Sequence, residues 1–184
     1  MAKVPRAVEQ HRAMWRWTGR ERPPWAEEPG PGQESVWDYP RPPRIAPDSR
    51  EVIVRLGGEI IAQTSSAVRV LETAGGPVFY LPPTDVRSEF LELSPRSSHC
   101  EWKGRAAYWT VRVGSQLEVD VGWSYPDPYP EFESMRDYLS FYPGRLECTV
   151  DGERVRPQPG GFYGGWITDE IVGPIKGGPG SQGW

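Results

Sequence analysis

Long apolar runs and cysteine pairs are what this 184-residue chain lacks. No apolar run approaches the roughly 18 to 20 residues that a membrane-spanning helix needs, and the first residues carry no apolar segment of a secretory signal. The two cysteines, Cys100 and Cys148, are too few for a disulfide framework, and no CxxC pair is present. These absences predict a cytoplasmic protein with free thiols and no membrane partner.

Metal ligands and positive charge are also scarce. The chain has two histidines beside its two cysteines, so a tetrahedral zinc site would need all four residues, His11 of the N-terminal segment included. The net charge of -4 gives no basic footprint for nucleic acid. We therefore expect no metal, no cofactor and no nucleic-acid partner, and the sequence does not indicate an oligomeric state.

Glycine, proline and aromatic residues are abundant instead. Glycine and proline number 21 each, and the chain has nine tryptophans and eight tyrosines. Glycine and proline interrupt helices and strands, so the elements should be short and the loops many. The rings argue against disorder. This combination is typical of a β-rich domain or of a surface that stacks flat ligands, and the length fits one domain with an extension.

Residues 1–34 differ from the rest and are predicted to be an N-terminal arm and linker. The run AVEQHRAMWRW can form a short helix with Val8 and Trp15 on one side, and a Pro/Gly-rich linker follows. Its Arg and Trp side chains could stack on nucleic acid or bind a partner protein. Because the whole chain is acidic, an arm whose tryptophans attach it to the domain is the favoured interpretation.

Residues 35–184 carry the strand signals. Two hairpins are predicted at tight turns, Gly57-Gly58 within 51–64 and Asp151-Gly152 within 146–156, and a third turns at Gly104-Arg105-Ala106. Strict alternation over 117–125 places one set of apolar residues on a single face of a strand: Leu117, Val119, Val121, Trp123 and Tyr125.

Helical structure should be minor. One helical turn is predicted after Thr84 as N-cap, and a short helix over 131–141 should bury Phe132, Met135 and Leu139. The Gly/Pro-rich tail from Pro157 should lack regular structure and attach through its apolar residues: Phe162, Tyr163, Trp166 and Ile171. The pattern as a whole predicts a mainly β fold of two packed antiparallel sheets, or a small open barrel, with one or two short helices and long Pro/Gly-rich termini.

Seven motifs in this order resemble one protein family: SVWDYPRPPR, RVLET, FYLPPTDV, CEWKGRAAYW, WSYPDP, FYPGR and DGERVRPQPGGFYGGW. Together they are similar to the DUF427 family over about residues 35–184. The resemblance implies a β-tent (Mss4-like) architecture, in which two antiparallel sheets are pinned together at one edge. It implies no established reaction, although some members carry a nucleotidyltransferase label.

Two kinds of catalysis can be compared with the residues. A nucleotidyltransferase needs paired carboxylates, but Asp120 follows Gly114-Ser115 too closely and has no acidic residue two positions later. A cysteine enzyme could use Cys100. On a straight strand, however, Cys100 and Trp102 face one side, while His99 and Lys103 face the other, so His99 is a poor base for Cys100. Cys148 shares the inner face of its predicted strand with Leu146 and Val150, so we expect it to be a core residue.

A ligand pocket is the interpretation we favour. Rings supply apolar walls, and a few charged groups orient a polar or anionic ligand. Nine residues are the candidates: Arg69, Glu72, Tyr80, Cys100, Trp102, Lys103, Trp123, Tyr125 and Tyr142. In the competing interpretation Arg69 and Glu72 form an ion pair, which requires the strand to end near Leu71, and the rings are core. We therefore predict a binding domain for a small polar or anionic molecule. The alternative is an enzyme of unknown reaction that uses Cys100 or a carboxylate; the catalytic residues stay unknown.

Overall fold

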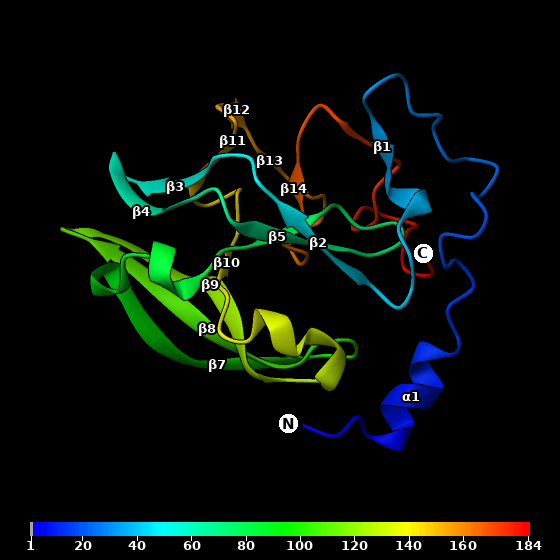
Figure 1. Ribbon diagram of the computed structural model, residues 1–184, viewed down its shortest axis with the longest axis horizontal. Helices are drawn as coiled ribbons and strands as arrows, with labels where there is room; N and C mark the ends of the chain where they lie inside the picture. The colour runs from blue at the N-terminus through cyan, green and yellow to red at the C-terminus, as the bar shows by residue number, and fades with distance from the viewer. Residues whose placement is uncertain (1) are drawn as a thin grey trace.

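The computed structural model describes residues 2–184, so Met1 of the predicted arm lies outside the described residues. Several sheets, mostly antiparallel, are the main regular structure, which confirms the expected mainly β fold (Figure 1). Many strands are short, but β7, β8 and β9 have 10, 10 and 13 residues. Apart from 3-10 turns, α1 (Arg6–Arg12) is the single helix in the described part of the chain. None of the helices of residues 2–184 has the length and apolar character that a membrane crossing requires.

One four-stranded sheet contains two of the predicted hairpins. Its order is β12-β11-β3-β4, with β3 Val52–Leu56, β4 Glu59–Thr64, β11 Glu147–Val150 and β12 Glu153–Arg154. Gly57 and Gly58 have φ of +60° and +88°, and Asp151 and Gly152 have +47° and +80°. Two consecutive positive φ angles are what a two-residue hairpin turn needs, so both predicted turns are confirmed.

The second four-stranded sheet, β10-β9-β8-β7, corrects two predictions. It consists of β7 Leu91–Cys100, β8 Gly104–Val113, β9 Gln116–Pro128 and β10 Ser140–Phe141. The β7–β8 turn is Glu101–Lys103, not Gly104–Ala106, because Gly104 already pairs with Cys100. The alternation in β9 is interrupted at Asp120, whose φ is +54°. Residues 121–125 are all buried, whereas Leu117 and Val119 are exposed.

The remaining strands form a three-stranded sheet, β2-β5-β6, and two short pairs. Their bounds are β2 Arg44–Asp48, β5 Ala67–Leu71, β6 Val78–Tyr80, β1 Glu34–Ser35, β13 Arg156–Pro157, β14 Trp166–Ile167 and β15 Ile171–Val172. The tail therefore contains short strands, contrary to the prediction. Trp166 and Ile171 attach it by burial, but Phe162 and Tyr163 are exposed, which corrects their expected role.

The 3-10 turns are η1 Val36–Asp38, η2 Pro83–Asp85, η3 Ser88–Phe90 and η4 Pro130–Met135. Thr84 is not an N-cap, because η2 begins after Pro82 and has no capping side chain. Phe132 and Met135 are buried as predicted. However, η4 ends before Asp137, whose φ of +62° is incompatible with a continuing helix. Leu139 is also buried, but it follows η4 and is not part of a helix.

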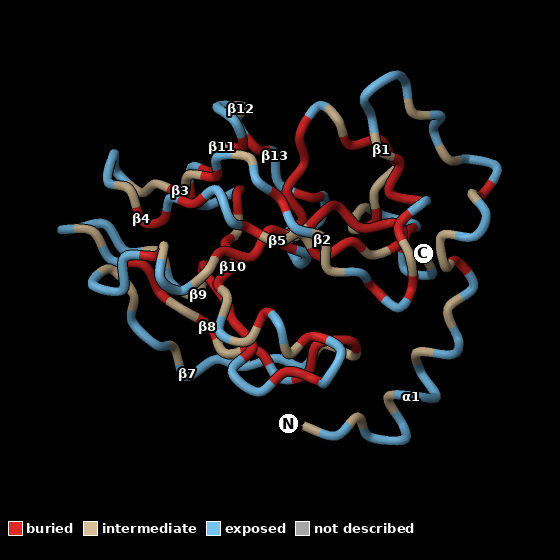
Figure 2. The backbone as a smooth tube through the Cα atoms, viewed as in Figure 1, coloured by how far each residue is buried: buried red, intermediate tan, exposed pale blue. Residues whose placement is uncertain are grey.

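Buried residues run through the middle of the molecule, between the sheets (Figure 2). One core cluster lies around Val54, Phe141 and Cys148, and a second consists mostly of aromatic rings. A third joins the arm to the tail, where Trp17, Trp25, Trp37 and Trp184 contact one another edge-on or stacked. The arm passes along the side of the molecule where the C-terminal segment also lies (Figure 1).

Candidate functional site

Four of the predicted site rings lie together in the second core cluster: Tyr80, Trp102, Trp123 and Tyr125, here called the aromatic cluster. Trp123 donates its indole N–H to the Tyr80 hydroxyl over 3.1 Å, and the Tyr80 ring lies 6.3 Å from that of Tyr125. Cys100 and Tyr142 are half-buried against the cluster, with the Tyr142 ring 4.6 Å from that of Trp123.

Strand geometry and a glycine explain why these rings meet. Trp123 and Tyr125 are two residues apart on β9, so they share a face, and Tyr80 reaches them from the end of β6. The tail loop then closes over Trp123 at Gly164, where an added Cβ would lie 2.0 Å from the indole ring. The glycine-rich sequence of this loop therefore permits close packing of backbone on a flat ring.

Lys103 is buried, with 7% of its surface exposed. Its ammonium lies 5.6 Å from the centroid of the Tyr125 ring and 5.9 Å from that of Phe132. Among residues 2–184 no carboxylate lies within 4.0 Å of this ammonium, and it donates no hydrogen bond to an oxygen. Burial lowers the pKa of Lys103, but Cys100, Tyr80 and Glu72 raise it more, and the result lies above its ordinary value.

The turn at Glu101–Lys103 corrects our assignment of faces in this stretch. A straight strand would have put Lys103 on the side opposite Cys100, but the chain turns here and Lys103 interacts with the Cys100 sulfur. His99 does point away, since its Nε2 atom lies 3.0 Å from the Tyr129 hydroxyl. Cys148 is fully buried in the other core, where burial raises the pKa of its thiol.

Glu72 lies in a group of buried charges. Its carboxylate accepts hydrogen bonds from Arg41 Nε over 3.2 Å and from Lys176 Nζ over 3.1 Å. Burial raises the pKa of Glu72, but the charges of Lys176, Arg41 and Lys103 lower it more, so it lies below its ordinary value. Arg41, Glu72, Lys103 and Lys176 are called the charge cluster below; it holds three cations and one anion.

Arg41 and Lys176 were not among the predicted residues. The Arg41 side chain is 1% exposed and also donates to the carbonyl groups of Trp17 and Thr73. Burial lowers the pKa of Lys176 more than the Glu72 charge raises it. Both residues stand in Pro- or Gly-rich segments without periodicity, so no local pattern marks them as partners of Glu72.

Arg69 lies apart from this group. It forms ion pairs with Glu34 and Asp48, each over 3.1 Å, and not with Glu72. Because β5 stays extended to Leu71, residues 69 and 72 face opposite sides of the strand. The structure therefore brings eight of the nine predicted residues to one region and places Arg69 in another.

The N-terminal arm covers the charge cluster. Beyond the end of α1, Trp15 donates its indole N–H to Glu101 Oε1 over 2.9 Å, and His11 Nδ1 lies 2.6 Å from the other oxygen. The Arg41 guanidinium lies 3.9 Å from the centroid of the Trp15 ring, and Lys176 Nζ lies 5.9 Å from it. These contacts agree with the interpretation that the arm attaches to the domain. No sequence pattern indicates that Trp15 would contact Arg41 and Lys176, the partners of Glu72.

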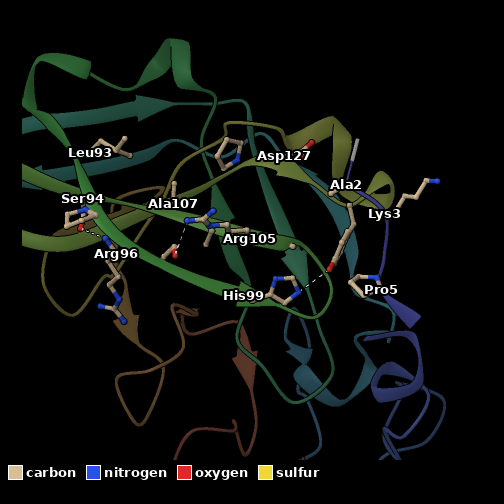
Figure 3. Close-up of a pocket in the computed structure, with 16 residues that line it drawn as sticks. Ala2, Lys3, Pro5, Leu93, Ser94, Arg96, His99, Arg105, Ala107 and Asp127 are labelled. Atoms are coloured by element: carbon tan, nitrogen blue, oxygen red, sulfur yellow. Dashed lines mark hydrogen bonds between the residues drawn. The ribbon is translucent and has the colours of Figure 1, made fainter. Parts of the chain in front are cut away.

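Two clefts open at the surface nearby. The first, of about 520 Å³, lies beside the aromatic cluster and is lined by Tyr142 together with Arg96, Asp120, Arg145 and the loop from Pro157 to Tyr163. The second, of about 630 Å³, lies between the first residues of the arm and the β7–β8 hairpin (Figure 3). Of the nine predicted residues, Tyr142 alone lines one of these two clefts. In residues 2–184, no three His, Cys, Asp or Glu side chains are placed to hold a metal ion.

Comparison with protein families identifies the domain. A family model described as a domain of unknown function (DUF427) covers residues 44–152, more than half of the chain. The matched segment includes Glu72, Cys100 and Lys103 but neither the arm nor the tail, so Trp15 and Lys176 lie outside it. No curated protein matches the chain.

Proposed function

This chain belongs to the DUF427 family, a domain of unknown function, and from that premise we propose that it binds a small anionic molecule at the charge cluster. The excess of positive charge carries this proposal. Two of the three buried cations, Arg41 and Lys176, bond to the carboxylate of Glu72, and Lys103 has no oxygen as a hydrogen-bond partner among the described residues. The carboxylate of Glu101, two residues before Lys103 in the sequence, is already engaged by the arm.

Buried cations are costly unless anions and hydrogen bonds compensate for their lost hydration. A bound carboxylate or phosphate would supply both to Lys103. The rings of Tyr80 and Tyr125 would provide apolar walls around a small polar ligand, as in many small-molecule sites. The unpartnered indole N–H of Trp102 offers one further donor in the same cluster.

Thermal unfolding of the full chain with citrate, inorganic phosphate, adenosine monophosphate and glucose tests the proposal. A ligand that binds the native state raises the melting temperature. We expect at least one anion to raise it and glucose to have no effect. Lys103→Met should abolish the rise, whereas Lys3→Met, a change in the arm far from the cluster in sequence, should preserve it. The proposal fails if no anion acts or if Lys103→Met responds like the wild-type protein.

A cysteine enzyme is the second candidate, because Lys103 interacts with the Cys100 sulfur. Reactive cysteines are often found beside a lysine or arginine side chain. Cys100→Ser separates the two candidates. A binding domain keeps its anion-dependent rise in melting temperature in this variant. Chemistry at Cys100 instead predicts a covalent adduct that mass spectrometry detects on the wild-type protein and not on Cys100→Ser.

A further inference from the structure

The 520 Å³ cleft is a separate site with its own chemistry. It lies between the corner Tyr142–Arg145, which follows β10, and the tail loop Pro157–Tyr163. None of the four members of the charge cluster lines it. Sites for small molecules typically have about 300 to 1,000 Å³, so the cleft can hold one.

Asp120 is the unusual residue of this cleft. It has φ of +54°, at a register shift between β8 and β9. A left-handed backbone is uncommon for residues other than glycine, although aspartate tolerates it better than most, and residues in this conformation are frequent at functional sites. The side chain is 21% exposed, and neither carboxylate oxygen accepts a hydrogen bond within the described residues. Arg96 is its ion-pair partner, but the Arg96 NH1 and Asp120 Oδ2 atoms are 3.7 Å apart. The carboxylate therefore lacks a donor, which a ligand can provide.

Aromatic rings stand at the same cleft. Phe162 is 74% exposed, and its ring lies edge-on at 5.0 Å from that of Tyr163. The Tyr142 hydroxyl donates to the carbonyl oxygen of Phe162 over 3.3 Å and so connects the two walls. Exposed ring faces close to a carboxylate attract an organic ammonium group, through the ring quadrupole as well as the charge.

The two arginines restrict the ligand further. Arg96 and Arg145 both line the cleft, and Arg145 is held by Glu118 over 2.8 Å. A simple cation would meet two guanidinium groups, and a simple anion would meet the carboxylate of Asp120, which accepts no hydrogen bond within the described residues. A ligand that carries both charges satisfies each side.

We propose that this cleft binds a small zwitterion of the α-amino-acid type, with its ammonium group at Asp120, its carboxylate toward Arg96 and Arg145, and its side chain against Tyr142 and Phe162. This site goes beyond the anion site at the charge cluster and does not depend on it.

Calorimetric titration of the full chain with three matched probes tests the site. L-Phenylalanine carries both charges, L-phenylalaninamide lacks the carboxylate and 3-phenylpropionate lacks the ammonium group. We expect L-phenylalanine to bind and each analogue to bind at least about tenfold more weakly, since a hydrogen bond to a charged group contributes about that factor. Equal binding of either analogue, or no binding of L-phenylalanine at its solubility limit, overturns the proposal.

Asp120→Asn is the decisive variant, because asparagine accepts a left-handed backbone and keeps the shape of the side chain. It should weaken L-phenylalanine binding about ten- to a hundredfold without lowering the melting temperature of the unliganded protein. The matched control is Asp169→Asn, whose side chain is 83% exposed and pairs with Arg156 outside the cleft. Unchanged binding by Asp120→Asn would overturn the assignment. Lys103→Met should leave this binding unchanged, which keeps the outcome distinct from that of the anion site.

Discussion

Replacing Glu72 with glutamine tests how much the charge cluster stabilises the fold. The carboxylate connects Arg41, which precedes β2, to Lys176 in the tail. Its loss leaves two buried cations without their common anion. Breaking a buried pair in this way costs about 3 to 5 kcal/mol. Because the Glu72 side chain is 20% exposed, water reaches the site in part, and we expect about 3 kcal/mol.

Urea unfolding and thermal unfolding at neutral pH measure this loss. For a chain of this size, about 3 kcal/mol corresponds to a fall in melting temperature of about 6 to 12 °C. The pH dependence gives a second readout. Burial raises the pKa of Glu72, but Lys176, Arg41 and Lys103 lower it more, below its ordinary value of 4.5. A lowered carboxyl pKa stabilises the fold above pH 4.5, and this contribution disappears as the pH falls through the folded-state value. The wild-type and variant curves should therefore converge in acid.

Glu89→Gln is the control, because Glu89 forms an exposed ion pair with Arg87. It should leave the unfolding midpoint unchanged. If Glu72→Gln has the same midpoint as Glu89→Gln at neutral pH, the charge cluster does not stabilise the fold, and the reasoning from buried charge is wrong. Excess anion provides a further comparison: it should recover more stability in Glu72→Gln than in the wild-type protein, because the variant leaves three cations without a carboxylate.

Three other predictions concern the arm, the thiols and the tail loop. Trp15→Ala removes a hydrogen bond to Glu101 and the ring above Arg41, so trypsin should cleave the arm about ten- to a hundredfold faster. An unchanged cleavage rate would show that these contacts do not hold the arm. Ellman's reagent should label one thiol of the native protein, that of half-buried Cys100. It should label two thiols after unfolding, because Cys148 is fully buried in the native protein. Labelling of the native Cys100→Ser variant would contradict this prediction. Gly164→Ala should lower the free energy of unfolding in urea by about 3 kcal/mol, since its Cβ would lie 2.0 Å from an indole ring. Gly161→Ala should lower it by about 1 kcal/mol, because residue 161 has free space around it but a φ of +69°. Equal losses would contradict the packing argument.

Local chemistry was sufficient to predict much of the sheet structure. Gly57-Gly58 and Asp151-Gly152 allow the positive φ angles of tight turns, and the flanking β-branched runs have few alternatives to a strand. The family could also be anticipated, because several specific motifs occur in a fixed order. Strand alternation correctly separated His99 from Cys100, since both belong to the regular part of β7.

Predictions failed where backbone irregularities redirect the chain. The turn at Glu101–Lys103 brings Lys103 to the side of Cys100, and the positive φ of Asp120 interrupts the alternation of β9. Neither has a strong local signal, because lysine is uncommon as a turn marker and aspartate tolerates both extended and left-handed backbone. Without these positions, neither the side of the sheet on which Lys103 lies nor the residues of the 520 Å³ cleft could be assigned correctly.

The amino-acid sequence by itself determined the class of fold, the hairpin turns and the set of aromatic residues available to a site. Only the tertiary structure decided which charges meet. Arg41, Glu72 and Lys176 are distant in sequence, and Trp15 comes from a segment with no pattern that marks its partner. Periodicity reports which side of an element is buried, whereas the pairing of buried charges depends on how separate elements pack together.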